Sequence, residues 1–366
     1  MHRIDQDPGA RERLLAWLEP VIRREPGQNG FRQLLVRLLL ELDRAEEALP
    51  HLEALAPMAP RFRLEAARLC VRTGRAVQGR EHARALLETI RRSPSRGSEE
   101  AELAELRIEA LYLFGDLDQA LSRASEAMVK HPDHADLPRL RSRLLREKAR
   151  QLADVATRPE EGSRSPLAEP LIPLARDDDV RERQFALLLE AARMPGAGAG
   201  PYDELLGFAL RNPTYREEFR KILIERLAGG ETPAFIHTLL GLLEWEIGDV
   251  RRARTHWELA SDRDPVDLRA LNNLAWALAS IEPKDLERAL SLVDRVLSLR
   301  PDLDAALDTK GQILYSMGRK TEAVRYLESA LEGLKGNPQL RKTLARLYEE
   351  MGMPEIAAHH QEAIGK

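Results

Sequence analysis

Residues 304–364 decide the fold of this chain, and they read DAALDTKGQILYSMGRKTEAVRYLESALEGLKGNPQLRKTLARLYEEMGMPEIAAHHQEAI. Within this stretch Gly318 returns as Gly352 and Ala323 returns as Ala357, each after about 34 residues, a period typical of a repeated pair of helices. The stretch therefore predicts two consecutive helical hairpins with a glycine in each turn.

The same pattern extends toward the N-terminus and predicts further units of the same kind. The units begin near Ala234, Leu268, Asp304 and Pro338. Small residues such as Gly311 and Ala323 fall where the two helices of a unit cross, since a larger side chain would force them apart. Glycine in the turn tolerates a positive φ, and proline after the second helix ends it. Two extra residues around Glu282 and Pro283 lengthen the turn of the second unit.

This pattern resembles that of tetratricopeptide repeats, of the bacterial type. In the unit from Ala234, the matching positions are Leu240 and Gly241 on the first helix, Gly248 in the turn and Trp257 on the second helix. The resemblance implies an all-α fold, a right-handed α-α superhelical solenoid of helix-turn-helix repeats arranged as two arrays joined by a linker. The stretch 272–279, NNLAWALA, is similar to repeats common in bacterial proteins that organise envelope, export or polysaccharide machinery.

Four segments are expected along the 366 residues. Residues 1–155 are expected to form a degenerate N-terminal array, 156–179 a Pro/Ser-rich linker, 180–233 a helical connecting segment, and 234–366 a C-terminal array of four units. In the connecting segment we predict helices at Val180–Arg193 and Tyr202–Ala228. Residues near Ala10–Glu25 resemble a second helix without its first, so the chain is expected to start inside a repeat.

The amino-acid composition limits which partners and which cellular compartment are expected for this protein. The formal net charge of −4 and the pI near 6.2 argue against a nucleic-acid partner. Cys70, the only cysteine, is predicted to be a core residue because it has no partner for a disulfide or a metal site. No block of about 18–20 apolar residues is present, so no membrane span is predicted. A cytoplasmic location is the default expectation, with a periplasmic or membrane-anchored one if an upstream signal is missing.

No catalytic, cofactor or metal site is predicted, so the protein is not expected to be an enzyme. The glycine-rich run 196–200 lacks the Gly-Lys-Ser/Thr sequence that binds phosphates, which favours a turn. His131 with His134, and His359 with His360, have no matching set of ligands nearby in the sequence. All four histidines are interpreted as surface residues.

The family resemblance also implies where a partner would bind. First helices line a concave groove in this family, and positions 2, 5, 9 and 12 of each unit lie on its wall; these spacings share one helical face. With Asn273 added, the residues here called the groove set are Phe235, Thr238, Leu242, Trp245, Arg269, Asn272, Asn273, Trp276, Asp308, Gln312, Tyr315, Lys342 and Arg346. Asn273 stands where a family asparagine often hydrogen-bonds the backbone of a bound peptide.

The groove set suggests how a partner segment would be held. Trp245, Trp276 and Tyr315 would supply apolar anchors, since tryptophan, tyrosine and arginine dominate binding hot spots. Arg269, Asn273, Lys342 and Arg346 would orient a polar or acidic peptide. A second interpretation stays open for the two tryptophans, in which they fill the seam between neighbouring repeats.

The chaperone-binding clamp of the family is not expected here. Thr238 and Leu242 stand where that clamp would have its first lysine and asparagine.

These features predict a non-catalytic scaffold or adaptor that binds a protein or peptide partner in the groove. The alternative is a peptide-responsive regulator whose solenoid changes shape on ligand binding. The last predicted helix, Pro354–Ile364, lacks the polar capping helix that solenoids usually need. Self-association through its apolar side, which includes Ile356 and Ile364, is therefore a further expectation.

Overall fold

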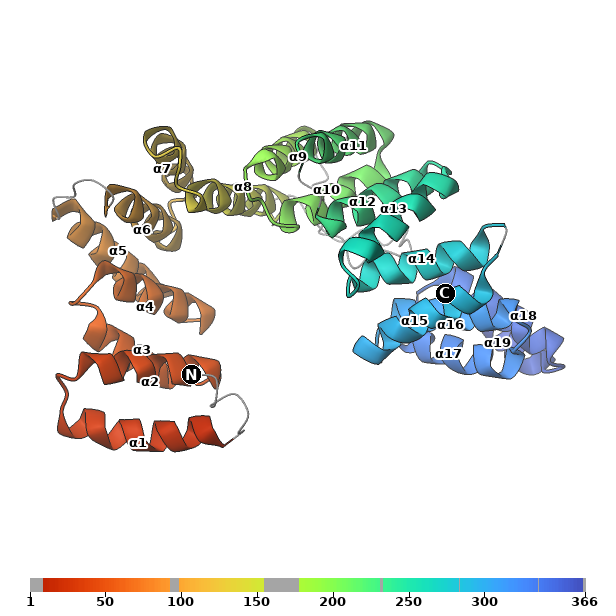
Figure 1. Cartoon of the computed structure of the whole chain (residues 1–366), viewed down its shortest axis with the longest axis horizontal. Helices are drawn as coiled ribbons and strands as arrows, with labels where there is room; N and C mark the ends of the chain where they lie inside the picture. Colours follow the sequence, from red (N-terminus) through yellow and green to blue (C-terminus); the bar gives the residue numbers. More distant parts are fainter. Residues whose placement is uncertain are drawn as a thin grey trace. The chain divides into compact units, whose positions relative to one another are not determined.

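The computed structural model describes residues 9–92, 99–154, 178–230, 233–282, 284–334 and 336–364. Within these ranges the chain forms nineteen α-helices and no β-strand. Consecutive helices pack against each other as hairpins, so the predicted all-α solenoid is confirmed (Figure 1). The helices belong to two compact units.

The first unit comprises the described parts of Met1–Gln151 together with Glu190–Gly198. Its helices are α1 (Ala10–Arg24), α2 (Asn29–Glu41), α3 (Ala45–Leu55), α4 (Pro60–Arg72), α5 (Ala76–Arg92), α6 (Glu99–Phe114), α7 (Leu117–Lys130) and most of α8 (Asp136–Asp154). The pairs α2–α3, α4–α5 and α6–α7 are the hairpins of this unit.

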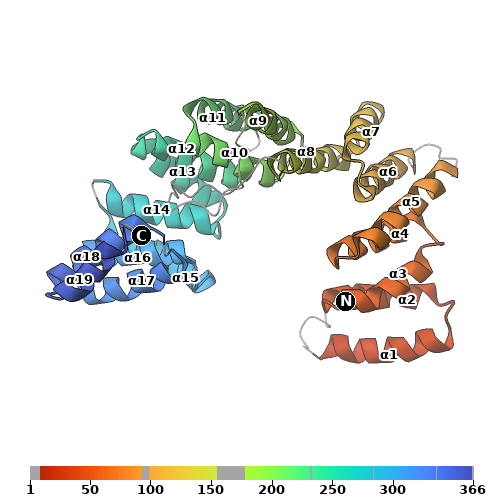
Figure 2. The same ribbon diagram turned by 180° about the vertical axis from the view of Figure 1, so that it is seen from behind.

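The second unit comprises the described parts of Leu152–Leu189 and Ala199–Lys366. Its helices are α9 (Asp178–Arg193, as far as Leu189), α10 (Gly200–Arg211), α11 (Pro213–Ala228), α12 (Ala234–Glu246), α13 (Val250–Arg263), α14 (Leu268–Ser280), α15 (Leu286–Leu299), α16 (Asp304–Ser316), α17 (Lys320–Gly333), α18 (Pro338–Glu350) and α19 (Pro354–Glu362). The hairpins α12–α13, α14–α15, α16–α17 and α18–α19 follow in succession, as Figure 2 shows from behind.

Side-chain caps and turn glycines explain where these helices begin and end. The carboxylate of Asp267 accepts the amides of Arg269 and Ala270 at the start of α14, and Asn337 does the same at the start of α18. Gly318 ends α16 with a φ of 78°, and the next amide, that of Arg319, bonds back to the carbonyl of Leu314 at 2.9 Å. The helix ends predicted from the sequence are thus stabilised by hydrogen bonds.

Small residues allow the two helices of a hairpin to cross closely. A Cβ added at Gly241 on α12 would lie 2.3 Å from Nε1 of Trp257 on α13. A Cβ added at Gly311 on α16 would lie 2.5 Å from Cγ of Leu327 on α17. In both hairpins, the large residue of the second helix packs onto the glycine of the first.

The segment Tyr202–Ala228, predicted as helical, consists of two helices. These are α10 and α11, and they are separate because Asn212 takes an extended conformation with φ −139° and ψ 123°. Its side chain caps α11 by accepting the amide of Thr214, and Pro213 occupies the first turn of that helix.

The predicted linker at 156–179 falls outside the described residues up to residue 177, and α9 begins at Asp178. Cys70 is fully buried in the first unit, as predicted. Among the helices that the structure describes, none is both long and apolar enough to span a membrane.

Candidate partner-binding face

Every member of the groove set lies on a first helix of the second unit, on α12, α14, α16 or α18. The members at the fifth position of each helix are Thr238, Asn272, Asp308 and Lys342. The first three are buried and Lys342 is exposed. The polar groups of the set therefore differ strongly in their surroundings.

Two of these polar residues are engaged within the protein. The hydroxyl of Thr238 donates to Oδ2 of Asp267 at 2.8 Å, which links α12 to the cap of α14. The guanidinium of Arg269 lies 2.8 Å from Oδ1 of Asp203 on α10. Arg269, predicted to orient a peptide, thus already has an acidic partner in its own chain.

The adjacent asparagines of α14 are differently placed. Asn272 and Asn273 are only 4% and 1% exposed. Oδ1 of Asn272 and Nδ2 of Asn273 are buried, and neither has a hydrogen-bond partner among the residues that the structure describes. An unpaired buried polar group costs roughly 1–3 kcal/mol of stability, so this pair is the most unusual feature of the set.

Asp308 is a buried carboxyl group with no ion pair to any residue that the structure describes. Burial raises the pKa of Asp308 to about 6, while the hydrogen bond from Gln312 opposes that shift. Nε2 of Gln312 lies 3.3 Å both from Oδ1 of Asp308 and from the hydroxyl of Thr343 on α18. Gln312 therefore connects the third unit of the array to the fourth.

The last two units also bring a tyrosine and two cations to this face. The hydroxyl of Tyr315 donates to Oε1 of Glu350 at 2.7 Å. Lys342 and Arg346, on α18, are both exposed.

The apolar members of the groove set are mostly packed. Leu242 is a core residue at 3% exposure. The ring of Phe235 lies 5.3 Å from that of Tyr202, and the indole of Trp245 lies 5.7 Å from that of Trp257. Trp276 is half-buried.

Several buried ionisable groups were not anticipated from the sequence. Nδ1 of His237 on α12 lies 3.1 Å from Nδ1 of His256 on α13, and burial lowers the pKa of His237 to about 4. Glu244, 1% exposed, receives a 2.9 Å hydrogen bond from Arg220 on α11. Their partners lie on neighbouring helices, which sequence spacing alone does not reveal.

The surface assignment of His360 is wrong. His360 is only 4% exposed and its Nε2 lies 3.1 Å from Oε1 of Glu328 on α17. His134 is half-buried and lies beside Glu105 and Asp136.

This geometry defines a helical-repeat protein whose successive first helices share one face. Residues 238–304 match one family model of the tetratricopeptide repeat, and residues 305–332 match a second. The chain therefore contains tetratricopeptide repeats within residues 238–332. The repeats support a role as a protein-interaction scaffold in general, and proteins built from them are generally non-catalytic.

Several solved structures are similar to this chain. MamA residues 41 to the end from Desulfovibrio magneticus RS-1 is 17% identical with a TM-score of 0.38, covering 45% of this chain and 92% of its own. MamA MSR-1 is 20% identical with a TM-score of 0.36, covering 45% of this chain and 92% of its own. The human IFIT1 dimer with PPP-AAAA is 14% identical with a TM-score of 0.45, covering 98% of this chain and 81% of its own. No curated protein sequence matches the chain.

Proposed function

We propose that the chain is a non-catalytic scaffold that binds a segment of a partner protein along the face of α12, α14, α16 and α18. The observation that carries this proposal is the pair of buried, unpartnered amide atoms on Asn272 and Asn273. A side-chain amide offers one acceptor and two donors, which matches the amide and carbonyl of an extended peptide backbone. Both atoms are closed to solvent, so a bound segment would satisfy them by displacing the side chains that cover them.

The charged members of the face suggest the chemistry of that segment. Lys342 and Arg346 are exposed on α18 and would attract an acidic group at that end of the array. Arg269 is already paired with Asp203, so its contribution to peptide binding would require that pair to open. The half-buried indole of Trp276 would anchor an apolar side chain beside the asparagines.

The proposal is tested by site-specific photo-crosslinking of the full-length chain in cells of the source organism. A photoreactive residue placed at Arg346 should capture one defined protein, and the same residue at Arg295, exposed on α15, should not. Equal capture from both positions would reject this face as the binding site.

The purified partner then allows the asparagines to be tested separately. Asn273→Ala and Trp276→Ala should each weaken binding by roughly tenfold or more, as expected for hot-spot residues. Leu299→Ala removes an exposed apolar side chain from α15 and serves as the matched control. If all three variants bind as the wild type does, these residues are structural. A change in solenoid dimensions on binding a short free peptide would instead favour the regulator.

A further inference from the structure

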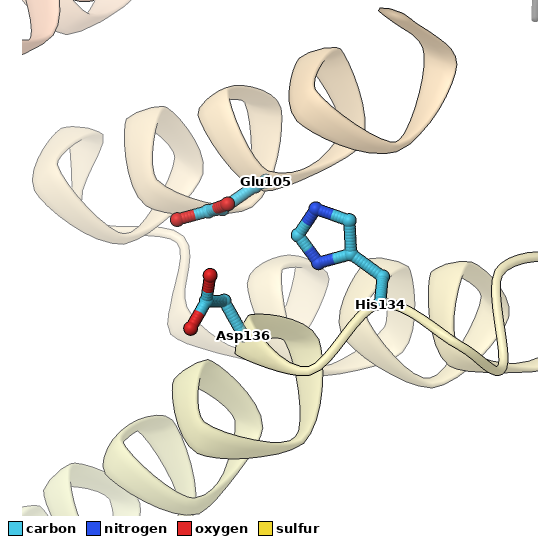
Figure 3. Close-up of side chains that lie close together, drawn as sticks. All are labelled: Glu105, His134 and Asp136. Atoms are coloured by element: carbon cyan, nitrogen blue, oxygen red, sulfur yellow. The ribbon is translucent and has the colours of Figure 1, made fainter. Parts of the chain in front are cut away.

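Three potential metal ligands converge in the first unit, on elements other than the helices of the proposed partner face. Glu105 comes from α6, His134 from the connection between α7 and α8, and Asp136 is the first residue of α8 (Figure 3). One ligand atom from each side chain lies within 4.8 Å of the other two. Figure 3 shows the imidazole and the two carboxylates gathered around one point.

The hydrogen bonding around this cluster is incomplete. Nδ1 of His134 is buried, and no described residue forms a hydrogen bond with it. No ion pair links Glu105 to a cationic side chain in the part of the chain that the structure describes. Asp136 is bonded through Oδ1 to Arg139 at 3.1 Å, which leaves its other oxygen without a bond of its own among the described contacts.

The charges around Glu105 also favour a cation. Burial raises the pKa of Glu105, and the negative charges of Asp136 and Glu109 raise it further, against smaller opposing effects of His134 and Arg68. Glu109 itself is held by Arg68 and Arg143, at 2.6 and 2.7 Å. The protein thus neutralises Glu109 with two arginines but provides no such partner for Glu105.

We propose that Glu105, His134 and Asp136 bind a divalent transition-metal ion of the Zn²⁺ class. Imidazole nitrogen selects ions of this kind over Mg²⁺ and Ca²⁺, which prefer all-oxygen sites. Zn²⁺ bonds to nitrogen and oxygen at about 2.0–2.2 Å, which puts tetrahedral ligand atoms about 3.4 Å apart. The ligand atoms, which now lie within 4.8 Å of one another, would have to approach to that separation on binding, and a fourth position would be filled by water or a further ligand.

Such an ion would add a second link between α6 and α8, which already share the ion pair between Glu109 and Arg143. It would tie α6 to the start of α8, across the intervening helix α7. Because the ligands come together only in the folded chain, bound metal would stabilise the first unit by mass action.

The test is a Zn²⁺ titration of the full-length, tag-free and chelator-treated chain in competition with a chromogenic chelator. The wild type should bind one Zn²⁺ ion per chain with a Kd in the micromolar range or tighter, and Zn²⁺ should raise its melting temperature. Glu105→Gln and Asp136→Asn keep the side-chain shapes, and each should weaken Zn²⁺ binding by roughly tenfold or more. His134→Gln should weaken it at least as much.

Two matched controls share the loop and the helix of the site. His131→Gln changes the other histidine of the α7–α8 connection, and Glu102→Gln changes an exposed carboxylate of α6. Both should bind Zn²⁺ as the wild type does. Because Asp136 is exposed, Asp136→Asn keeps the test informative if another variant fails to fold. The proposal is overturned if Zn²⁺ does not bind at micromolar concentrations, if the ligand variants bind it unchanged, or if Mg²⁺ or Ca²⁺ binds more tightly.

Discussion

Single atoms decide how closely the helices of this protein approach. At Gly241 no side chain larger than hydrogen fits without moving the indole of Trp257, whose Nε1 also donates to the carbonyl of Thr238 at 3.2 Å. Gly241→Ala should therefore lower the free energy of unfolding by roughly 1–3 kcal/mol, measured by urea denaturation, because overpacking displaces a buried ring. Gly30→Ala is the control: nothing lies within 4 Å of its added Cβ in α2. Equal stability of the Gly241 variant and the wild type would show that the crossing is looser than described.

The buried carboxyl of Asp308 gives the protein an unusual pH dependence. Its pKa of about 6 in the folded chain lies above the ordinary aspartate value of 3.8, so the folded state binds the proton more tightly than the unfolded state does. This group should therefore add stability as the pH falls from about 6 to about 4, and its charged form should be destabilising above pH 6. Asp308→Asn should raise the free energy of unfolding by about 2–3 kcal/mol at pH 8 and have little effect below pH 4.

The exposed residue Asp302 provides the comparison for this measurement. Asp302→Asn should leave the pH profile of stability unchanged. A stable Asp308→Asn variant that binds the partner poorly would show that the carboxylate is retained for binding. A variant with no gain in stability at pH 8 would mean that the charged form is well solvated.

At the scale of the helix, the sequence predicted the C-terminal units well and the connecting segment less well. The capping residues Asp267 and Asn337 directly precede the predicted unit starts Leu268 and Pro338, and α14 and α18 begin at those residues. The break at Asn212 was not predicted, because the apolar pattern of the segment continues through Pro213. A proline in a first turn and a proline inside a helix cannot be distinguished from apolar spacing alone.

The candidate face was also predicted only in part: features set by nearby residues were predicted, and contacts between residues distant in the sequence were not. Position within the repeat predicted which residues lie on first helices, because helical spacing is local. It did not predict that Arg269 pairs with Asp203, 66 residues earlier in the sequence. For the same reason, the sequence did not predict that Glu105, on α6, lies close to His134; the packing of the helices brings them together.

Helix α19 carries a testable expectation of its own. Ile356 and Met353 are each 42% exposed, which leaves an apolar strip at the α18–α19 hairpin. We expect sedimentation velocity to show concentration-dependent self-association at tens of micromolar, and Ile356→Glu to abolish it. Val266→Glu, at an exposed apolar position between α13 and α14, should not. A monomer at every concentration would contradict this expectation.

For the whole molecule, the division into two compact units predicts unfolding in more than one step. Repeat arrays gain stability from neighbouring hairpins, so each unit should unfold according to its own packing. Of the four tryptophans, only Trp17 belongs to the first unit. Fluorescence of Trp17→Phe should therefore report the second unit alone, and circular dichroism of the same variant should show an additional transition. Coincident transitions by both methods would show that the units unfold together.

The contact between Gly241 and Trp257 also restricts how repeats of this kind can diverge or be exchanged. The same two repeat positions hold Gly311 with Leu327, and Ala275 with Val293, so a larger residue on one helix accompanies a smaller one on the other. Mutations at such paired positions are expected to be accepted only together during evolution. In a shuffled array, α14 would replace α12 as the partner of α13. The indole of Trp257 would then meet the methyl group of Ala275. The two helices of a hairpin are therefore expected to be exchanged only together.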